Sequence, residues 1–209
     1  MPSMPESRDG DVYLQFLESR RSRRQFGPGS VPPEEVDLVV QAAGWAPSPH
    51  KTRPWRFVIV STPEIKERLV HRMASAFESD LRNDSILSED RIRARIQKSL
   101  DLLLPASALL IPCLYKEDLD RYPDAFRRTA EETMATQSLG AALQNVLLAA
   151  HARNIAACWV CAPLFCPDLV RSILDLPADF HPHMLVALGR PPREEPPERP
   201  AYALTVLHR

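Results

Sequence analysis

The spacing of hydrophobic and polar positions predicts a chain in which helices alternate with strands. A first helix is expected from Asp11, which can cap its N-terminus, and it is expected to run into the arginine-rich residues 20–24. A second helix is expected to begin at residues 32–33, because proline suits a first helical turn. A third is expected over residues 63–77. The polar, charge-rich stretch after it, residues 79–95, is expected to form a mobile surface excursion.

Short apolar runs have the length and composition of buried strands. They cover residues 55–61, 107–115, 155–161, 184–188 and 201–207. Pro112 has no N–H to donate, so the second strand is expected to end early or to lie at a sheet edge.

The longest helical pattern, residues 125–153, contains no proline and a single glycine. A helix of this length in a small protein is expected to be central, buried by the core or by a second subunit. A short helix is expected over residues 167–174. These elements favour an α+β fold over a doubly wound one. Residues 1–10 are expected to form a flexible leader, and residues 11–209 one domain that ends in an extended, proline-rich arm, residues 190–209.

Composition excludes several classes of function. The net charge of −1 provides no bulk field for nucleic acid or a membrane surface. No apolar run approaches the roughly 20 residues that a membrane-spanning helix needs. The N-terminal segment has no apolar signal core, which predicts a cytoplasmic protein. The glycines form neither GxGxxG nor a Walker A loop, and neither GxSxG nor HExxH is present.

The cysteines near the C-terminus offer a possible zinc site. Cys158, Cys161 and Cys166 stand near His181 and His183 in the sequence. However, CxxC spacing alone is a weak signal, and two sulfurs on one buried strand would point to different faces of the sheet. The favoured interpretation is small buried hydrophobic residues, and no metal is expected.

Two polar motifs carry more specific chemistry. RRSRR, residues 20–24, is either a solvated basic helix end or a phosphate cradle, in which guanidinium groups and the Ser22 hydroxyl make charge-assisted hydrogen bonds. The second motif is APSPHKTRPWRF, residues 46–57. A loop that enters a strand explains Trp55 and Phe57 but not the polar residues packed between prolines. A stiff polar loop suits ligand binding.

Together these motifs resemble the nitroreductase family of FMN enzymes, which has a basic RxS-type motif followed by a PSxxNxQPW-like loop. The resemblance extends through the long helical pattern and CWV, residues 158–160. It implies a nitroreductase-like fold with a central, mostly antiparallel sheet, flanking helices and a C-terminal arm swapped in a homodimer. PHKTRPWRF, CWVCAPLF and LVALGRPP are also similar to the C-terminal FMN domain of the two-domain enzyme of deazaflavin coenzyme F(420) biosynthesis. Nothing in this chain corresponds to the ligase domain of that enzyme.

The resemblance also implies roles for individual residues. The basic helix end and the arm are expected to bind the FMN phosphate, and Arg24 is expected to face the pyrimidine edge of the flavin. The loop is expected to contact the flavin of the partner subunit. The segment after the third strand is expected to lie along the ring face near N5. The cofactor-binding residues implied are Arg20, Arg21, Ser22, Arg24, Pro47, Ser48, Pro49, Lys51, Arg53, Cys161, Ala162, Pro163, Leu164 and Arg199. The chain departs from the family pattern at several positions. Lys51 stands where nitroreductases commonly have asparagine, and Cys161 stands where the F(420)-linked group often has glycine. Asn154 and Ala156 also replace glycines that are usual before the third strand.

The function expected is an FMN-dependent oxidoreductase in which the chemistry takes place on the flavin, so no catalytic side chain is required. The substrate expected is a small molecule, in particular an anionic dehydro precursor of coenzyme F(420). One alternative is a generic NAD(P)H-dependent nitro or ene reductase, and another is a flavin-binding protein without turnover.

Overall fold

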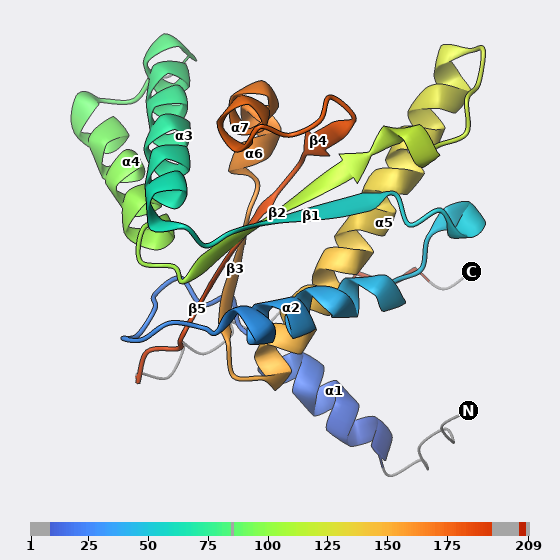
Figure 1. The fold of residues 1–209 in the computed structure, drawn as a ribbon, viewed down its shortest axis with the longest axis horizontal. Helices are drawn as coiled ribbons and strands as arrows, with labels where there is room; N and C mark the ends of the chain where they lie inside the picture. Colours follow the sequence, from blue (N-terminus) through green and yellow to red (C-terminus); the bar gives the residue numbers. More distant parts are fainter. Residues whose placement is uncertain (1–8, 85, 194–204, 208–209) are drawn as a thin grey trace.

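A five-stranded antiparallel sheet organises the computed structural model, which describes residues 9–84, 86–193 and 205–207 (Figure 1). The strand order is β1 (Trp55–Val60), β2 (Ala108–Tyr115), β5 (Leu185–Gly189) and β3 (Ala156–Val160), and β4 (Phe180–Pro182) also pairs with β2. All the pairings are antiparallel, which confirms the expected α+β architecture.

The position of β2 corrects the expectation based on Pro112. β2 is an inner strand, hydrogen-bonded to β1 along its whole length. On its other side it pairs with β5 through Ala108–Leu110 and with β4 through Cys113–Tyr115. Pro112 therefore lies in the gap between these two partners, where the ladder needs no N–H, and its carbonyl oxygen accepts a hydrogen bond from the His183 amide at 3.1 Å.

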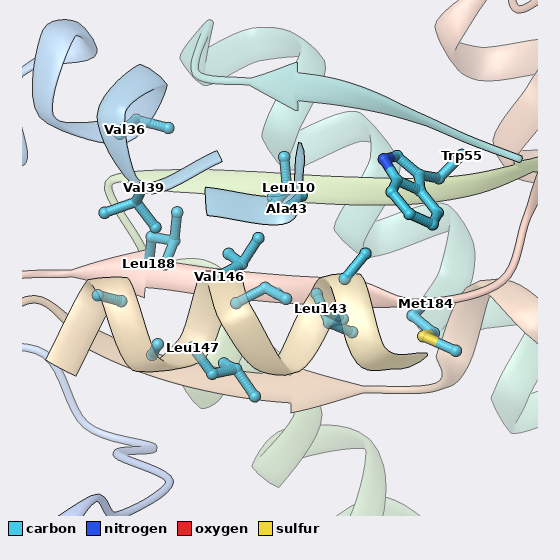
Figure 2. Close-up of a cluster of buried hydrophobic side chains, with 14 of the residues drawn as sticks. Val36, Val39, Ala43, Trp55, Leu110, Leu143, Val146, Leu147, Met184 and Leu188 are labelled. Carbon is cyan, nitrogen blue, oxygen red and sulfur yellow. The ribbon is translucent and has the colours of Figure 1, made fainter. Parts of the chain in front are cut away.

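One face of the sheet packs against the long helix α5 (Ala125–Ala152), as the helical pattern predicted. The Asp124 side chain caps this helix by accepting a hydrogen bond from the Arg127 amide at 2.9 Å. The helix α2 (Pro33–Gln41) and the 3₁₀ turn η1 (Ala42–Trp45) pack against the same cluster. Figure 2 shows side chains of α2, α5 and the sheet converging in this part of the core.

The opposite face is covered by α3 (Pro63–Asp84), α4 (Glu89–Leu103) and α7 (Pro167–Leu174). The expectation of a mobile excursion over residues 79–95 was wrong, since most of this stretch is helical. Leu100 and Leu103 of α4 pack into the hydrophobic cluster on this face of the sheet, and Ile92 is also buried, so α4 has an apolar side despite its many charged residues.

The first helix, α1 (Asp9–Ser19), lies at the C-terminal end of α5 (Figure 1). It begins before Asp11 and ends before the arginines rather than running into them, so residues 9 and 10 of the expected leader are helical. Its contacts with α5 centre on His151, whose ring lies 5.0 Å from that of Phe16 and whose Nε2 lies 2.8 Å from the Ser19 hydroxyl.

The C-terminal arm lies mostly outside the described residues. The described part of the expected last strand, residues 205–207, has no regular secondary structure in this chain. Among the helices that the structure describes, none has both the length and the apolar character required to cross a bilayer.

Candidate functional site

The basic segment, residues 20–24, lies against the beginning of β3. The Arg23 amide donates a hydrogen bond to the carbonyl oxygen of Ala157 at 3.0 Å. Arg21 contributes further local order, because its guanidinium donates to the carbonyl oxygen of Arg20 at 3.1 Å and also to that of Glu18. The segment therefore follows the sheet edge rather than extending α1.

Positive charge accumulates where this segment meets α5 and β3. The pKa of His151 is lowered from 6.5, first by burial and then by the charges of Arg20, Arg23 and Arg21. Within the described part of the chain, Arg21, Arg23 and Arg24 form no ion pair with an acidic side chain. Three guanidinium groups, those of Arg21, Arg23 and Arg24, without an acidic counterpart among the described residues fit a phosphate dianion.

β3 connects this basic segment to the second part of the candidate site. Burial raises the pKa of the Cys158 thiol, and the charges of Arg24 and Arg20 oppose that rise, so these two guanidinium groups lie near the strand. Cys161 follows the end of β3 and precedes the one-turn helix α6 (Ala162–Phe165). From Ala157 to Cys161 an extended chain covers about 13 Å at about 3.3 Å per residue. This span suits the ribityl chain and part of the ring system of FMN.

A pocket of about 600 Å³ opens beside Cys161 and Ala162. Its other walls come from α3 and α4, and most of its lining is apolar, including Phe77, Leu81 and Phe165. Asp80 contributes the one charged side chain among the residues that line it. The sequence did not reveal this pocket, because part of its α3 wall, Asp80 and Leu81, falls in the stretch 79–95 that was expected to be a mobile excursion.

The loop motif adopts a strained conformation before β1. His50, Lys51 and Arg53 all have positive φ angles, of 53°, 56° and 49°. Such angles cost non-glycine residues of order 1–3 kcal/mol each, and they cluster at functional sites. Two hydrogen bonds maintain the turn. The Ser48 hydroxyl accepts from the Arg53 amide at 3.1 Å, and the Thr52 hydroxyl donates to the Pro49 carbonyl oxygen at 3.1 Å.

Within one chain this loop is remote from the basic segment. His50 lies beside Glu131 near the N-terminal end of α5, whereas the arginines surround His151 near its C-terminal end. The two positions on α5 are separated by twenty residues, or about 30 Å at about 1.5 Å per residue. FMN is too short to span that distance.

The structure therefore divides the predicted site residues into two groups. The first group lies along β3, with the basic residues at its beginning and the others beyond its end: Arg20, Arg21, Ser22, Arg24, Cys161, Ala162, Pro163 and Leu164. The second group lies apart from β3, in the loop before β1: Pro47, Ser48, Pro49, Lys51 and Arg53. Arg199 lies outside the described residues. Asn154 has a φ of 51°, in the left-handed region that favours glycine, and asparagine is among the non-glycine residues that tolerate it best.

The four cysteines, three of which were weighed as zinc ligands, differ in their exposure. Cys113, Cys158, Cys161 and Cys166 are free thiols, and none joins a metal-binding group within the described residues. Cys158 is buried in β3, while Cys161 lies beyond the strand and is exposed, so the expectation that both belong to one buried strand was wrong for Cys161.

A family model described as "Nitroreductase family" matches residues 17–190. The chain belongs to the nitroreductase family. Membership confirms the expected fold and the expected enzyme class, a flavin-dependent oxidoreductase with FMN as its cofactor.

Curated relatives of this nitroreductase-family chain include iodotyrosine deiodinases. That of Haliscomenobacter hydrossis is 28% identical over 184 residues, which are 86% of this chain and 79% of the relative. That of Danio rerio is also 28% identical over 184 residues, but the match covers 60% of its length. The chain thus spans less than two thirds of the vertebrate relative.

Solved structures of the same fold include FMN complexes. A nitroreductase-type protein from Desulfovibrio desulfuricans, in complex with FMN, is 25% identical with a TM-score of 0.64, over 90% of this chain and 91% of that one. An iodotyrosine deiodinase bound to FMN and 3-iodo-L-tyrosine has a TM-score of 0.71 over 94% and 98% of the two chains. Its 18% identity makes this a likeness of fold alone.

Proposed function

We propose that the protein is a homodimeric FMN-dependent reductase in which each flavin is held by residues of both chains. The observation that carries this proposal is the separation, about 30 Å along α5, between the basic segment and the strained loop. Both motifs can contact one flavin only if the loop comes from a second copy of the chain.

The exposed apolar surface supports an association of this kind. Val12, Leu14 and Leu17 of α1 are exposed in the single chain, and Trp45, just before the loop, is 81% exposed. Exposed apolar surface of this extent is typical of protein–protein contacts. An interface along α5 would cover α1 and Trp45 and bring the loop of one chain toward the arginines of the other.

Each group of residues has a distinct task in this site. Arg20, Arg21 and Ser22, together with Arg199 of the arm, bind the phosphate, and Arg24 provides positive charge at the pyrimidine edge of the flavin. The main chain of residues 161–164 lies along the ring face. From the partner, residues 47–53 close the other side. When bound, FMN supplies two-electron hydride chemistry, and the protein supplies orientation and shielding from water.

The substrate that the pocket suits best is a compact aromatic molecule. The pocket of about 600 Å³ adjoins Cys161 and Ala162, and Phe77, Leu81 and Phe165 give it an apolar lining. Aromatic rings bury well against such side chains. The deiodinase relatives lend support to reductive chemistry on an aromatic ring. NAD(P)H is the proposed source of electrons.

The dehydro precursor of coenzyme F(420) is the second candidate substrate. It is supported by the resemblance of PHKTRPWRF, residues 49–57, and CWVCAPLF, residues 158–165, to the F(420)-linked domain. However, the described residues that line the pocket include Asp80 and no basic side chain, so an anionic substrate would have to place its charges outside the pocket.

The test is an anaerobic assay of the FMN-loaded protein. NADH or NADPH should bleach the flavin absorbance, and adding a nitroaromatic compound, 3-iodo-L-tyrosine or the dehydro precursor should restore it at different rates. The fastest rate with a compact aromatic acceptor supports the proposal. A flavin that no donor reduces would indicate a binding protein without turnover.

A further inference from the structure

Glu131 is a buried residue whose carboxylate has one oxygen without a hydrogen-bond partner among the described residues. Its residue is 3% exposed, and its Oε2 makes no hydrogen bond among the described residues. Burying a carboxylate costs several kcal/mol unless a cation or hydrogen-bond donors compensate it. The packing of α5 against the hydrophobic core does not explain why a glutamate occupies this position.

Two further ligand-type side chains converge on this carboxylate. One ligand atom each from His50, Asp120 and Glu131 lies within 4.8 Å of the other two, and His50 Nε2 lies 3.9 Å from Asp120 Oδ2. The three residues come from the loop before β1, from the segment after η3 (Lys116–Asp118) and from α5. We propose that they bind one divalent transition-metal ion, with Zn²⁺ as the best fit.

The chemistry of the donor set favours zinc over magnesium or calcium. One imidazole nitrogen and two carboxylate oxygens form a mixed N/O set, whereas Mg²⁺ and Ca²⁺ prefer oxygen ligands alone. Ligand atoms about 2.0–2.2 Å from a tetrahedral zinc lie roughly 3.4 Å apart, so the site needs only a small closure. Rotation of the exposed His50 and Asp120 side chains supplies that closure. A pocket of about 340 Å³ lined by Asp120 and Glu131 leaves room for water as the fourth ligand.

The cations nearby are engaged elsewhere. Lys116 pairs with Glu132 at 3.1 Å, and Arg121 pairs with Glu117 at 2.8 Å. The guanidinium of Arg128 donates to the carbonyl oxygens of Tyr122 and Pro123, at 3.2 and 2.7 Å. These are the basic groups that line the pocket, and none of them forms an ion pair with Glu131 in the described part of the chain.

A metal ion here has a structural consequence for the strained loop. His50 holds a φ of 53°, next to Lys51 at 56°. A bond from His50 to zinc joins this loop to α5 and compensates for its backbone strain. The ion therefore holds the loop in one conformation, independently of which substrate the enzyme reduces.

The test is zinc binding to the full-length, FMN-loaded protein in a buffer that does not chelate metal. Isothermal titration with ZnCl₂, after dialysis against a chelator and its removal, should show one ion per chain. Glu131→Gln, which is nearly isosteric, and His50→Ala, at an exposed position, should each weaken binding at least tenfold. Glu34→Gln is the matched control, since it removes an exposed glutamate of α2 and leaves the Lys116–Glu132 pair intact, and it should bind zinc as the wild type does. Hydrogen exchange of the amides of residues 50–53 should slow when zinc is added.

Two results would overturn the proposal. The first is a wild-type protein that binds no zinc at a total metal concentration on the order of 100 µM, because a three-ligand site should be occupied at that concentration. The second is zinc binding that persists unchanged in both His50→Ala and Glu131→Gln, since the ion would then occupy a different site.

Discussion

The Arg23 amide donates a hydrogen bond to the Ala157 carbonyl oxygen at 3.0 Å, which fixes the basic segment to the first residues of β3. Because β3 ends at Val160, just before Cys161, a single strand sets the distance between the proposed phosphate and ring ends of the flavin site. Both of these proposed ends belong to one chain, whereas the proposed dimer takes the loop that completes the site from a second chain.

Removing the proposed phosphate ligands should release FMN without unfolding the protein. Arg20→Ala combined with Ser22→Ala removes charge-assisted hydrogen bonds worth about 1.5–3 kcal/mol each, so FMN affinity should fall about 10- to 100-fold for each ligand removed. The ratio of flavin to protein absorbance measures this. Arg127→Ala, at the other end of α5, is the control and should keep its flavin. Full occupancy in the double variant would rule out the phosphate assignment.

Cysteine reactivity should report on the pocket. Cys161 is exposed and lines the pocket, whereas Cys113 is buried and burial raises the pKa of its thiol to about 12. Iodoacetamide at pH 8 should therefore modify Cys161 in the native protein and leave Cys113 intact, as read by peptide mass spectrometry. FMN together with an aromatic acceptor should slow modification of Cys161. Equal labelling of Cys161 with and without these ligands would show that the pocket is not part of the flavin site.

Stability should decrease as the pH falls below 6.5. The pKa of His183 is lowered from 6.5, mainly by burial and then by Lys116 and His181. Below pH 6.5 the unfolded chain therefore binds a proton more readily than the folded one, and the free energy of unfolding falls with pH. Urea unfolding at pH 7.5 and 5.5 measures the difference. His183→Gln should reduce this difference, and the exposed His71→Gln should leave it as in the wild type. An unchanged difference in His183→Gln would contradict the prediction.

Two glycine substitutions should act in opposite directions. A Cβ at Gly189 would lie 2.5 Å from Cδ1 of Phe26, whose ring packs against the core, so Gly189→Ala should destabilise the fold by about 1–3 kcal/mol. A Cβ added at Gly140 in α5 would meet no atom within 4 Å in the single chain apart from the neighbouring backbone of its own helix, so Gly140→Ala should stabilise the fold by about 0.5–1 kcal/mol. Thermal unfolding of both variants checks this, and a stable Gly189→Ala protein would mean that Phe26 moves easily.

The sequence predicted the elements whose periodicity is strong. The helix of residues 167–174 was predicted with its observed limits, and the limits of α5 were predicted to within one residue. The predictions were wrong where tertiary packing overrides a rule that considers only the local sequence. Pro112 reads as an edge residue, but a gap between two partner strands accommodates it. The many charged residues of the stretch 79–95 led to the prediction of a surface excursion. The apolar side of α4 is recognised as buried only when the helix is seen packed in the fold.

For the candidate site, too, the sequence shows local motifs but not how the fold places them relative to one another. The motifs at residues 20–24 and 46–57 are local in sequence, so a pattern of residue types reveals them. Their positions at opposite ends of α5 depend on the fold and are not encoded in their spacing. Likewise His50, Asp120 and Glu131 have no recognisable spacing, and the unpartnered carboxylate oxygen becomes visible only once α5 is packed.

Complementation between two defective chains tests the composite flavin site most directly. One chain carries Arg20→Ala and Ser22→Ala, the other carries Ser48→Ala and Lys51→Ala, and different affinity tags allow the mixed dimer to be isolated. If each site combines the basic segment of one chain with the loop of the other, the mixed dimer has one intact site and should bind one FMN, whereas both parent dimers bind little. If each chain holds its flavin alone, every site in the mixed dimer is defective. A mixed dimer without FMN would therefore contradict the account.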